Sequence, residues 1–510
     1  MKVIYIIKKS IMKKLYLLYI PNGLNSPEFE VLLSTAQLLI DKKKDVEIIT
    51  CGGGVDGEVY ATSKNVFSQS SIDKACRYKR NIGFKMLKGK FKLTYTPNLK
   101  NYKKFFKKNN LNDRRKINQI LIEKVDIGSC ALSSYLDFSR DAYLDGLLAK
   151  KTIKNLMNTS LNLMLYFKKK LKKNHHLITY NGRNNEYRPI LRVANLKKIK
   201  VSNLEWSGDG EKNIGIRDFK NHLPQDINNL GKIINNHWKV SSKINKCDHY
   251  FHYIKAGRVI NDKASYVLKQ NKNLLPKEWD NSKRNIVYFT SSMDEYFALG
   301  GVFDKTIYED QNISIKKIIS SLKKTNDKNV VLWIRCHPNL SNVFWKYNSE
   351  IYKLHDPSNR IFIIKPKSKI SSYKMLLNCE KIVNYASRTG IEAVYWKKPS
   401  IVLGRAIFEK LNSVYLPKNH NETMKLILDS ELKPKPKIGA IKWASYWVEG
   451  GYTQKYFDGS LRHGFKFKNT SIRFNLKIKL VYYVGKMTQY YLYNYLANYK
   501  FSFLKKVFNI

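Results

Sequence analysis

The chain has 510 residues, of which 43% are hydrophobic, and its 93 Lys and Arg against 40 Asp and Glu give a formal charge of +53. A chain of this length is too long for a single hydrophobic core, so more than one domain is expected. Its apolar content excludes a globally disordered chain. The charge favours polyanionic partners such as nucleic acid, anionic lipid or a phosphorylated substrate, while a coding bias toward Lys, Asn, Ile and Tyr explains it equally well.

Strand and helix patterns alternate in the first half of the chain. A buried strand at 15–20 ends at Pro21-Asn22-Gly23, and Ser26-Pro27-Glu28 has the residue order of a helix start. Such β-loop-α-β units build open parallel sheets. The order of residues 55–125 is not predicted. The other elements that we expect in this half are strands at 46–50, 176–180 and 199–204 and helices at about 28–41, 141–172 and 184–196.

The second half alternates more regularly, which predicts a doubly wound parallel sheet. Its expected strands lie at 285–290, 330–335, 360–364, 381–384 and 400–403, with helices at 312–324, 370–377 and from 387 to 396. The fold class is therefore α/β with two Rossmann-like domains. We expect domains at 1–261 and 285–440, a polar linker at 262–284, and C-terminal helices with a basic aromatic tail at 441–510.

Cysteine spacing and hydropathy bear on the compartment. The six cysteines form neither a CxxC motif nor a Cys/His cluster with zinc spacing, so we expect reduced thiols, a cytoplasmic protein and no metal site. The apolar runs at the N-terminus are short and interrupted by Lys, unlike a signal peptide. No apolar run reaches about 18 residues, so no membrane-spanning helix is expected.

Polar residues follow the strands of the second domain, at the edge where open α/β sheets bind ligands. The segment 387–392 stands where a strand turns into a helix, which suits a phosphate, with an ordinary capped helix as the alternative. The His that ends the second strand can donate to a phosphate or sugar oxygen or be structural. The donor-site candidates are Ser291, Ser292, Arg335, His337, Asn339, Ser387, Arg388, Thr389, Gly390 and Glu392.

Several further charged residues have two interpretations each. Arg335, Arg388 and Arg405 can pair with phosphates, although a single Arg is more often a surface residue. Asp294 and Glu295 either line the donor pocket or cap a helix.

The first domain offers residues that face the same gap by the same strand-end rule. Asn22 and Asn25 follow the first strand, and Asn181 and Arg183 follow a later one. The candidate bases are Glu28, Glu205 and Asp209, and spacing does not choose among them.

These motifs resemble the capsule polysaccharide biosynthesis transferases, within the GT-B class of glycosyltransferases. The matching segments are NGLNSPEFE near the start, NGR at 181–183, FTSSMDE at 289–295, RCHPN at 335–339 and SRTGIEAVYWKKPSIVLG at 387–404. Together they cover residues 13–420 discontinuously, and the last of them is the most specific.

The resemblance implies two Rossmann-like domains facing across a cleft, an acceptor-side first domain and a second domain that binds a nucleotide sugar, with metal-independent chemistry and no cofactor. It implies donor-site roles for His337, Ser387, Thr389, Gly390 and Glu392. Two departures stand out. Many retaining GT-B enzymes carry two acids eight positions apart, and Asn384 occupies the earlier position here. Some relatives have a pair of cysteines where this sequence has Cys76 alone.

The expected function is transfer of a sugar from a CMP- or UDP-linked donor to a lipid-linked or growing bacterial surface polysaccharide (capsule or lipopolysaccharide). The alternatives are a nucleotide-sugar epimerase or a wall-polymer glycerophosphotransferase of the same fold and, in another class, a basic nucleic-acid-binding protein. Because no nucleic-acid motif occurs, no nucleic acid is expected as partner.

The last fifty residues contain no acid after Asp458, and Lys and Arg alternate with Tyr and Phe. Residues 460–510 can bind an anionic membrane surface at its cytoplasmic face, bind nucleic acid, or pack back on the first domain.

Overall fold

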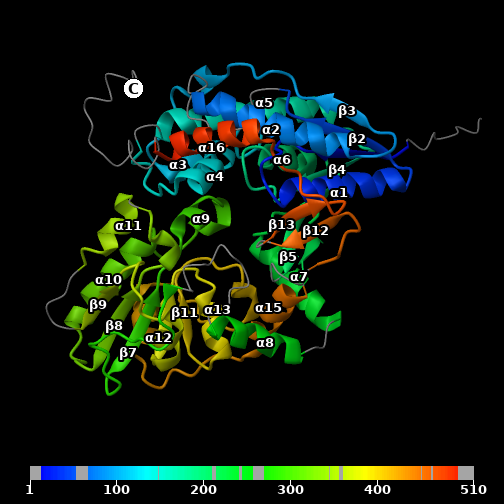
Figure 1. The fold of residues 1–510 in the computed structure, drawn as a ribbon. Helices are drawn as coiled ribbons and strands as arrows, with labels where there is room; N and C mark the ends of the chain where they lie inside the picture. Colours follow the sequence, from blue (N-terminus) through cyan, green and yellow to red (C-terminus); the bar gives the residue numbers. More distant parts are fainter. Residues whose placement is uncertain are drawn as a thin grey trace, which may run out of the picture.

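The protein is described by a computed structural model that covers residues 13–52, 67–146, 149–208, 214–240, 244–256, 269–343, 345–354, 360–449, 451–460 and 463–491. Two sheets stand at the centres of two lobes (Figure 1). The candidate base Asp209 and residues 492–510 of the tail lie outside the described residues.

The first lobe contains a six-stranded sheet in the order β3-β2-β1-β4-β5-β6. All its strand pairs are parallel except β5 with β6. Its elements are β1 (Leu15–Tyr19), α1 (Glu28–Asp41), β2 (Asp45–Thr50), α2 (Phe67–Lys85), β3 (Lys92–Tyr95), α3 (Arg114–Asn118), α4 (Ile127–Ser139), α5 (Ala149–Lys170), β4 (His175–Tyr180), α6 (Arg188–Leu196), β5 (Lys200–Gly208) and β6 (Ile214–Asp218).

The second lobe contains a five-stranded parallel sheet in the order β11-β10-β7-β8-β9. Its elements are β7 (Arg284–Phe289), α9 (Met293–Phe297), α10 (Gln311–Lys324), β8 (Val330–Arg335), α11 (Lys346–Ile351), β9 (Ile361–Ile364), α12 (Ser372–Asn378), β10 (Lys381–Asn384), α13 (Thr389–Tyr395), β11 (Ser400–Val402), α14 (His420–Leu428) and α15 (Ile438–Val448).

Both sheets have the strand order of a Rossmann-like domain, 3-2-1-4-5 counted from the first strand of each lobe. This confirms the predicted fold class. The order reverses between β1 and β4 in the first lobe and between β7 and β10 in the second. In such sheets the ligand binds beyond the carboxyl ends of the strands at this reversal. The fold therefore singles out the loops that follow β1, β4, β7 and β10.

The predicted domain boundary at 261 falls after two helices that belong with the second lobe by their packing. These are α7 (Ile227–Val240) and α8 (Ile244–Lys255). Leu230, Ile234 and Phe251 are buried in one cluster with Trp443 of α15, and the ring of Phe251 stacks on Tyr395 with centroids 3.9 Å apart. The chain thus enters the second lobe before the second sheet begins.

The described part of the expected linker at 262–284, which begins at residue 269, contacts the second lobe. Trp279 stacks on buried Trp333 of β8 with ring centroids 5.1 Å apart, and Gln270 accepts a hydrogen bond from the Ser372 amide at 2.8 Å. Residues 269–283 therefore pack on the second lobe, although their sequence lacks clear periodicity.

The helix predicted over 141–172 begins only at Ala149, as α5, and a turn separates it from the preceding helix α4. The helix α4 ends at Ser139, and Arg140 adopts a left-handed conformation with φ of 58°. Asp141 then accepts hydrogen bonds from the amides of Asp145 and Gly146, at 3.0 and 2.8 Å, which hold the turn before α5. The apolar pattern continues across this turn, which explains why the sequence did not predict the break.

The C-terminal segment returns to the first lobe. The hairpin β12 (Phe457–Ser460) and β13 (Gly464–Phe467) packs beside α1, and α16 (Leu476–Tyr491) lies along α2 (Figure 1). Tyr456 donates to Asp41 at 2.6 Å and Lys468 to Gln37 at 2.7 Å. Of the three interpretations of the tail, packing on the first domain holds for residues up to 491.

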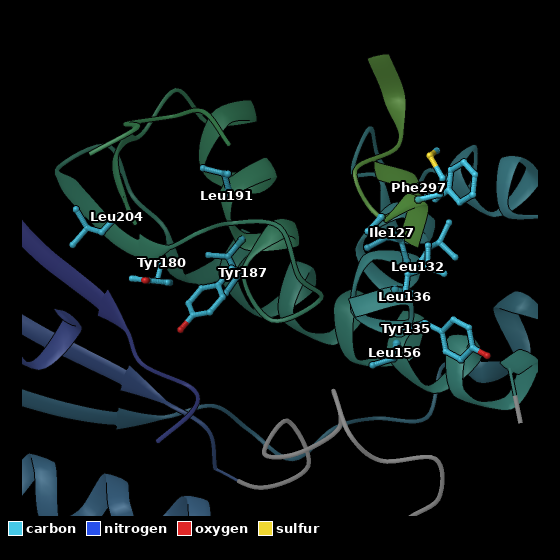
Figure 2. Packing of buried hydrophobic residues seen from close by; sticks show 14 of the residues in the cluster. Ile127, Leu132, Tyr135, Leu136, Leu156, Tyr180, Tyr187, Leu191, Leu204 and Phe297 are labelled. Carbon is cyan, nitrogen blue, oxygen red and sulfur yellow. The ribbon is translucent and has the colours of Figure 1, made fainter. Parts of the chain in front are cut away.

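Apolar and charged contacts join the two lobes at α4 and α9. Figure 2 shows Phe297 of α9 beside Ile127 and Leu132 of α4, and the Arg114 guanidinium lies 3.4 Å from the centroid of the Phe297 ring. Close by, Arg188 donates both to Asp126, at 2.7 Å, and to the Leu299 carbonyl, at 3.1 Å.

Replacing Asp126 with Asn should destabilise the protein by about 2 kcal/mol near neutral pH, because Arg188 would remain buried beside a neutral partner. Coulombic attraction by Arg188 and Arg192 outweighs burial and holds the Asp126 pKa below its ordinary 3.8. A lowered folded-state pKa adds stability above that value, and the protein loses it as the pH falls. Urea unfolding should therefore show a smaller decline below about pH 4 in Asp126→Asn than in the unsubstituted protein.

Candidate active site

Direct hydrogen bonds connect the three turns that follow β7, β8 and β10, at the carboxyl ends of the strands of the second sheet. The Ala386 amide donates to Ser291 Oγ at 3.1 Å, which joins the loops after β10 and β7 at the reversal point. The His337 amide donates to Thr290 Oγ1 at 2.8 Å, which adds the loop after β8. The structure therefore brings together the turns around Ser292, His337 and Gly390, as the strand-end rule predicts.

Arg140 reaches this junction from the first lobe. Its Nη2 donates to Ser292 Oγ at 2.6 Å, its Nε to Asp294 Oδ2 at 2.9 Å, and its Nη1 to the Asn339 carbonyl at 3.0 Å. The left-handed residue at the end of α4 thus places a guanidinium against two turns of the opposite lobe. Sequence reasoning missed Arg140, because nothing local distinguishes it among 93 basic residues.

His337 is a neutral imidazole at physiological pH. Burial and the neighbouring charges of Arg140, Arg388 and Arg335 lower its pKa to about 3. Its Nδ1 accepts a hydrogen bond from the Asn339 amide at 3.2 Å, which places the ring proton on Nε2. The ring is therefore a hydrogen-bond donor at Nε2, and the positive charge of the site comes from the arginines around it.

Glu392 lies on α13 under the exposed Arg388. The carboxylate is buried, accepts a hydrogen bond from the Tyr373 hydroxyl at 2.6 Å and interacts with the Arg388 charge. Burial raises its pKa, and these two partners oppose the rise. Glu392 thus accepts a hydrogen bond from a hydroxyl group and carries a charge that attracts Arg388. Tyr373 was not predicted as a site residue.

Gly390 and its neighbours pack tightly at the start of α13. A Cβ on Gly390 would lie 2.7 Å from the Asn384 side-chain nitrogen, so the glycine lets α13 approach β10. Ser387 Oγ and Thr389 Oγ1 are 3.0 Å apart, and Ser387 Oγ also accepts from the Thr389 amide at 3.3 Å. These contacts fix the turn that carries Arg388.

Two of the expected phosphate-binding arginines have other contacts. Arg335 is buried and donates to the Lys365 carbonyl at 2.9 Å and to Ser372 Oγ at 3.1 Å, so it holds the loops after β9 and before α12. Arg405 forms a bidentate pair with Glu409, at 2.9 and 2.5 Å. Arg388 and Arg140 are the other two guanidinium groups whose charges act on His337.

The first lobe contributes a pair of carboxyl groups at its own reversal point. Glu28, at the start of α1, accepts from the buried Tyr187 hydroxyl and from Asn25, and burial raises its pKa to about 8. Glu205 on β5 accepts from Asn181 and from the Tyr180 hydroxyl. The Glu205 charge contributes to the raised pKa of Glu28, so the two carboxyl groups are electrostatically linked.

Asn22 has a structural role in the same loop. Its side-chain oxygen accepts from the Leu24 amide at 2.8 Å, while Arg80 holds the loop by donating to the Pro21 carbonyl at 2.7 Å. These contacts fix the segment that leads to Asn25 and Glu28.

Arg183 interacts with acidic residues of both lobes. It donates to Asp137 at 2.6 Å and interacts with the charges of Glu205 and Glu295. Partial desolvation and the neighbouring Asp294 charge raise the pKa of Glu295, while Arg183, Arg140 and Arg388 oppose this rise. Acids and arginines of both lobes therefore form one continuous electrostatic network between β1, β4, β7 and β10.

Comparison with known proteins gives one family match and several structural neighbours. Residues 232–411 match the family model "Capsule polysaccharide biosynthesis protein". No curated protein matches the chain.

The beta Kdo 2,4 transferase of KpsC from Thermosulfurimonas dismutans is 12% identical, with a TM-score of 0.35 over 54% of this chain and 80% of that one. The beta Kdo 2,7 transferase of the same KpsC is 15% identical, with a TM-score of 0.32 over 56% and 80%. A UDP-GlcNAc 2-epimerase from Neisseria meningitidis is 10% identical, with a TM-score of 0.21 over 87% and 95%.

At these TM-scores the neighbours carry no argument about activity. The family match rests on the sequence of the second lobe together with α7 and α8, which pack on it. Over residues 232–411 the chain therefore matches the capsule polysaccharide biosynthesis family, which is the family that its motifs resemble.

Proposed function

We propose that the protein is a glycosyltransferase that binds a CMP- or UDP-linked sugar between its lobes and transfers the sugar to a surface polysaccharide. The observation that carries this proposal is the junction of the turns after β7, β8 and β10, where Arg140 and Arg388 stand beside a neutral His337. Guanidinium groups bind phosphates through paired charge-assisted hydrogen bonds. The family match of the second lobe supports the same assignment.

In this proposal the second lobe holds the donor. Arg388 and Arg140 neutralise the donor phosphates, His337 Nε2 donates to a phosphate or sugar oxygen, and Glu392 accepts from ribose hydroxyls. Ser291, Ser292 and Ser387 hold the turns in register through the contacts described above. Positive groups already in place stabilise the leaving phosphate as its charge develops, without reorganisation during the reaction.

The first lobe supplies the base. The acceptor hydroxyl oxygen attacks the anomeric carbon while the bond from that carbon to the phosphate oxygen breaks. The hydroxyl proton passes to Glu28, and the nucleotide leaves with the bonding electron pair. A base is most effective when its pKa is close to the working pH, which a carboxyl group with a pKa of about 8 satisfies. Asn25 and Tyr187 orient this group.

We further propose that the acceptor is a lipid-linked or growing bacterial capsule or lipopolysaccharide glycan and that the protein works in the cytoplasm at the inner face of the plasma membrane. Basic and aromatic residues predominate in the C-terminal segment, which suits an anionic lipid surface. Within the described residues, no helix combines the length and apolarity that crossing a bilayer requires.

A panel of nucleotide sugars tests the proposed donor class. A CMP- or UDP-sugar at about one hundred times its Kd should stabilise the folded protein by about 2.7 kcal/mol, which raises the melting temperature. Differential scanning fluorimetry with the free nucleotides and with GDP- and ADP-sugars as controls identifies the preferred base. If no nucleotide sugar moves the melting temperature, while DNA binds in a salt-sensitive manner, the nucleic-acid alternative replaces the transferase.

The same ligand distinguishes transfer from epimerisation. A transferase releases CMP or UDP only when a glycan acceptor is present, whereas an epimerase changes the sugar without releasing nucleotide. Chromatography of the nucleotide pool with and without acceptor separates the two activities.

A further inference from the structure

We propose that α16, together with the neighbouring face of α2, forms a surface that binds the headgroups and interfacial region of an anionic lipid bilayer. The inner side of α16 is occupied by its packing on the first lobe. Phe474, which precedes the helix, lies against Tyr482 with tilted rings whose centroids are 5.1 Å apart, and Lys79 of α2 lies 5.9 Å from the Phe474 ring centroid. Gly485 is buried in the same packing. This fixes the orientation of the opposite side.

The outer side of α16 is an exposed apolar stripe. The exposed fractions are 83% for Leu476, 68% for Leu480, 53% for Tyr483, 45% for Val484 and 57% for Met487. The positions follow the spacing of one helical face, with intervals of four, three, one and three residues. Each of these five side chains is therefore open to solvent, and together they lie on one surface of the protein. A contiguous apolar face on a folded protein marks a binding surface.

The surroundings of the stripe are basic. Lys477 and Lys479 on α16 are exposed. Asp458 is the last acidic residue of the sequence, so the segment that carries these lysines contains no carboxylate side chain to neutralise them. On the adjoining α2, exposed basic side chains recur on one helical face, at Lys74, Arg77 and Lys85. An apolar stripe flanked by lysines is typical of helices that lie in the plane of a membrane interface.

Charge complementarity selects anionic lipid over the other occupants. A second copy of this chain would bring a surface of the same positive sign and a formal charge of +53 against the stripe, which opposes association. A nucleic acid would match the lysines but not the aliphatic side chains of Leu476, Leu480 and Val484. Anionic headgroups with acyl chains beneath them match both parts.

Vesicle flotation of the full chain tests this surface. The unsubstituted protein should bind vesicles containing about one third phosphatidylglycerol and not vesicles of phosphatidylcholine alone. The triple variant Leu476→Ser, Leu480→Ser and Val484→Ser should weaken binding by at least about tenfold, because its apolar contacts with the interface are lost. The double variant Lys477→Gln and Lys479→Gln should weaken it by on the order of tenfold, and less so at high salt.

Matched controls replace exposed residues elsewhere. Phe105, Leu121 and Leu274 have exposed fractions of 70%, 60% and 40%, and their triple Ser variant should bind vesicles normally. Exposed Lys323 and Lys324 serve the same purpose for the charge variant. Melting temperatures within a few degrees of the parent confirm that the stripe variants fold. Vesicle binding that survives both the apolar and the lysine variant would overturn the proposal. So would a dimer in sedimentation experiments that only the apolar variant dissociates, because the stripe would then bind a second copy. Vesicle binding that appears only after removal of residues 492–510 would also overturn it.

Discussion

Glu28→Gln is expected to lower the rate of sugar transfer by at least about a hundredfold, because the amide cannot take the proton of the acceptor hydroxyl. Donor binding should remain intact, since Glu28 is not among the proposed donor contacts. Glutamine keeps an oxygen that accepts from the Tyr187 hydroxyl, so the local packing is retained. Single-turnover kinetics together with a donor titration separate the two effects.

The same substitution should stabilise the protein above about pH 5. The folded-state pKa of Glu28, about 8, exceeds its ordinary value of 4.5 because of burial. Between these values the unfolded chain ionises while the folded one keeps its proton, so stability falls as the pH rises through this window. Each pKa unit corresponds to about 1.4 kcal/mol, which makes the full cost several kcal/mol at most. Because glutamine does not ionise, the Glu28→Gln variant does not carry this free-energy cost.

The pH profile adds a further check on the role of Glu28. If the ionised form is the base, kcat/KM rises with pH and levels off above about 8, with about one tenth of the enzyme active at pH 7. A rate that falls over this range would instead identify a general acid. Transfer at the parental rate by Glu28→Gln would leave Glu205 and Asp209 as candidate bases.

Glu392→Ala is expected to weaken donor binding by about tenfold or more, since charge-assisted hydrogen bonds to ribose hydroxyls are lost and Arg388 loses the attraction of this carboxylate. The binding constant for the donor, measured by calorimetry, reports this loss directly. Tyr373→Phe is the matched control, because it removes only the hydrogen bond that the tyrosine donates to Glu392 at 2.6 Å. A smaller loss in Tyr373→Phe separates contact with the donor from positioning of the carboxylate. Undiminished affinity in Glu392→Ala would remove this residue from the site.

The strands of the second lobe could be predicted closely from the sequence. Each is a short apolar run that ends at polar residues, as at the end of β8 before Cys336, because parallel strands are buried on both faces. That the turns after these strands lie together followed from topology alone, since the rule for open sheets needs no side-chain contacts.

The remaining features depend on contacts between distant parts of the chain. Arg140 owes its place in the site to the left-handed turn after α4 and to the packing of α4 on α9, neither of which leaves a local pattern. The antiparallel strand β6 and the edge strand β3 were missed because their short sequences resemble loops. The tail was ambiguous because alternating basic and aromatic residues suit a protein surface and a membrane equally.

A crystal structure with the nucleotide that stabilises the protein most would test the central claim directly. We predict that its phosphates lie within hydrogen-bonding distance of Arg388 and of the turns at 290–292 and 337–339, with the sugar directed toward Glu28. A nucleotide bound elsewhere, with Arg140 and Arg388 out of its reach, would contradict the assignment of this junction as the donor site.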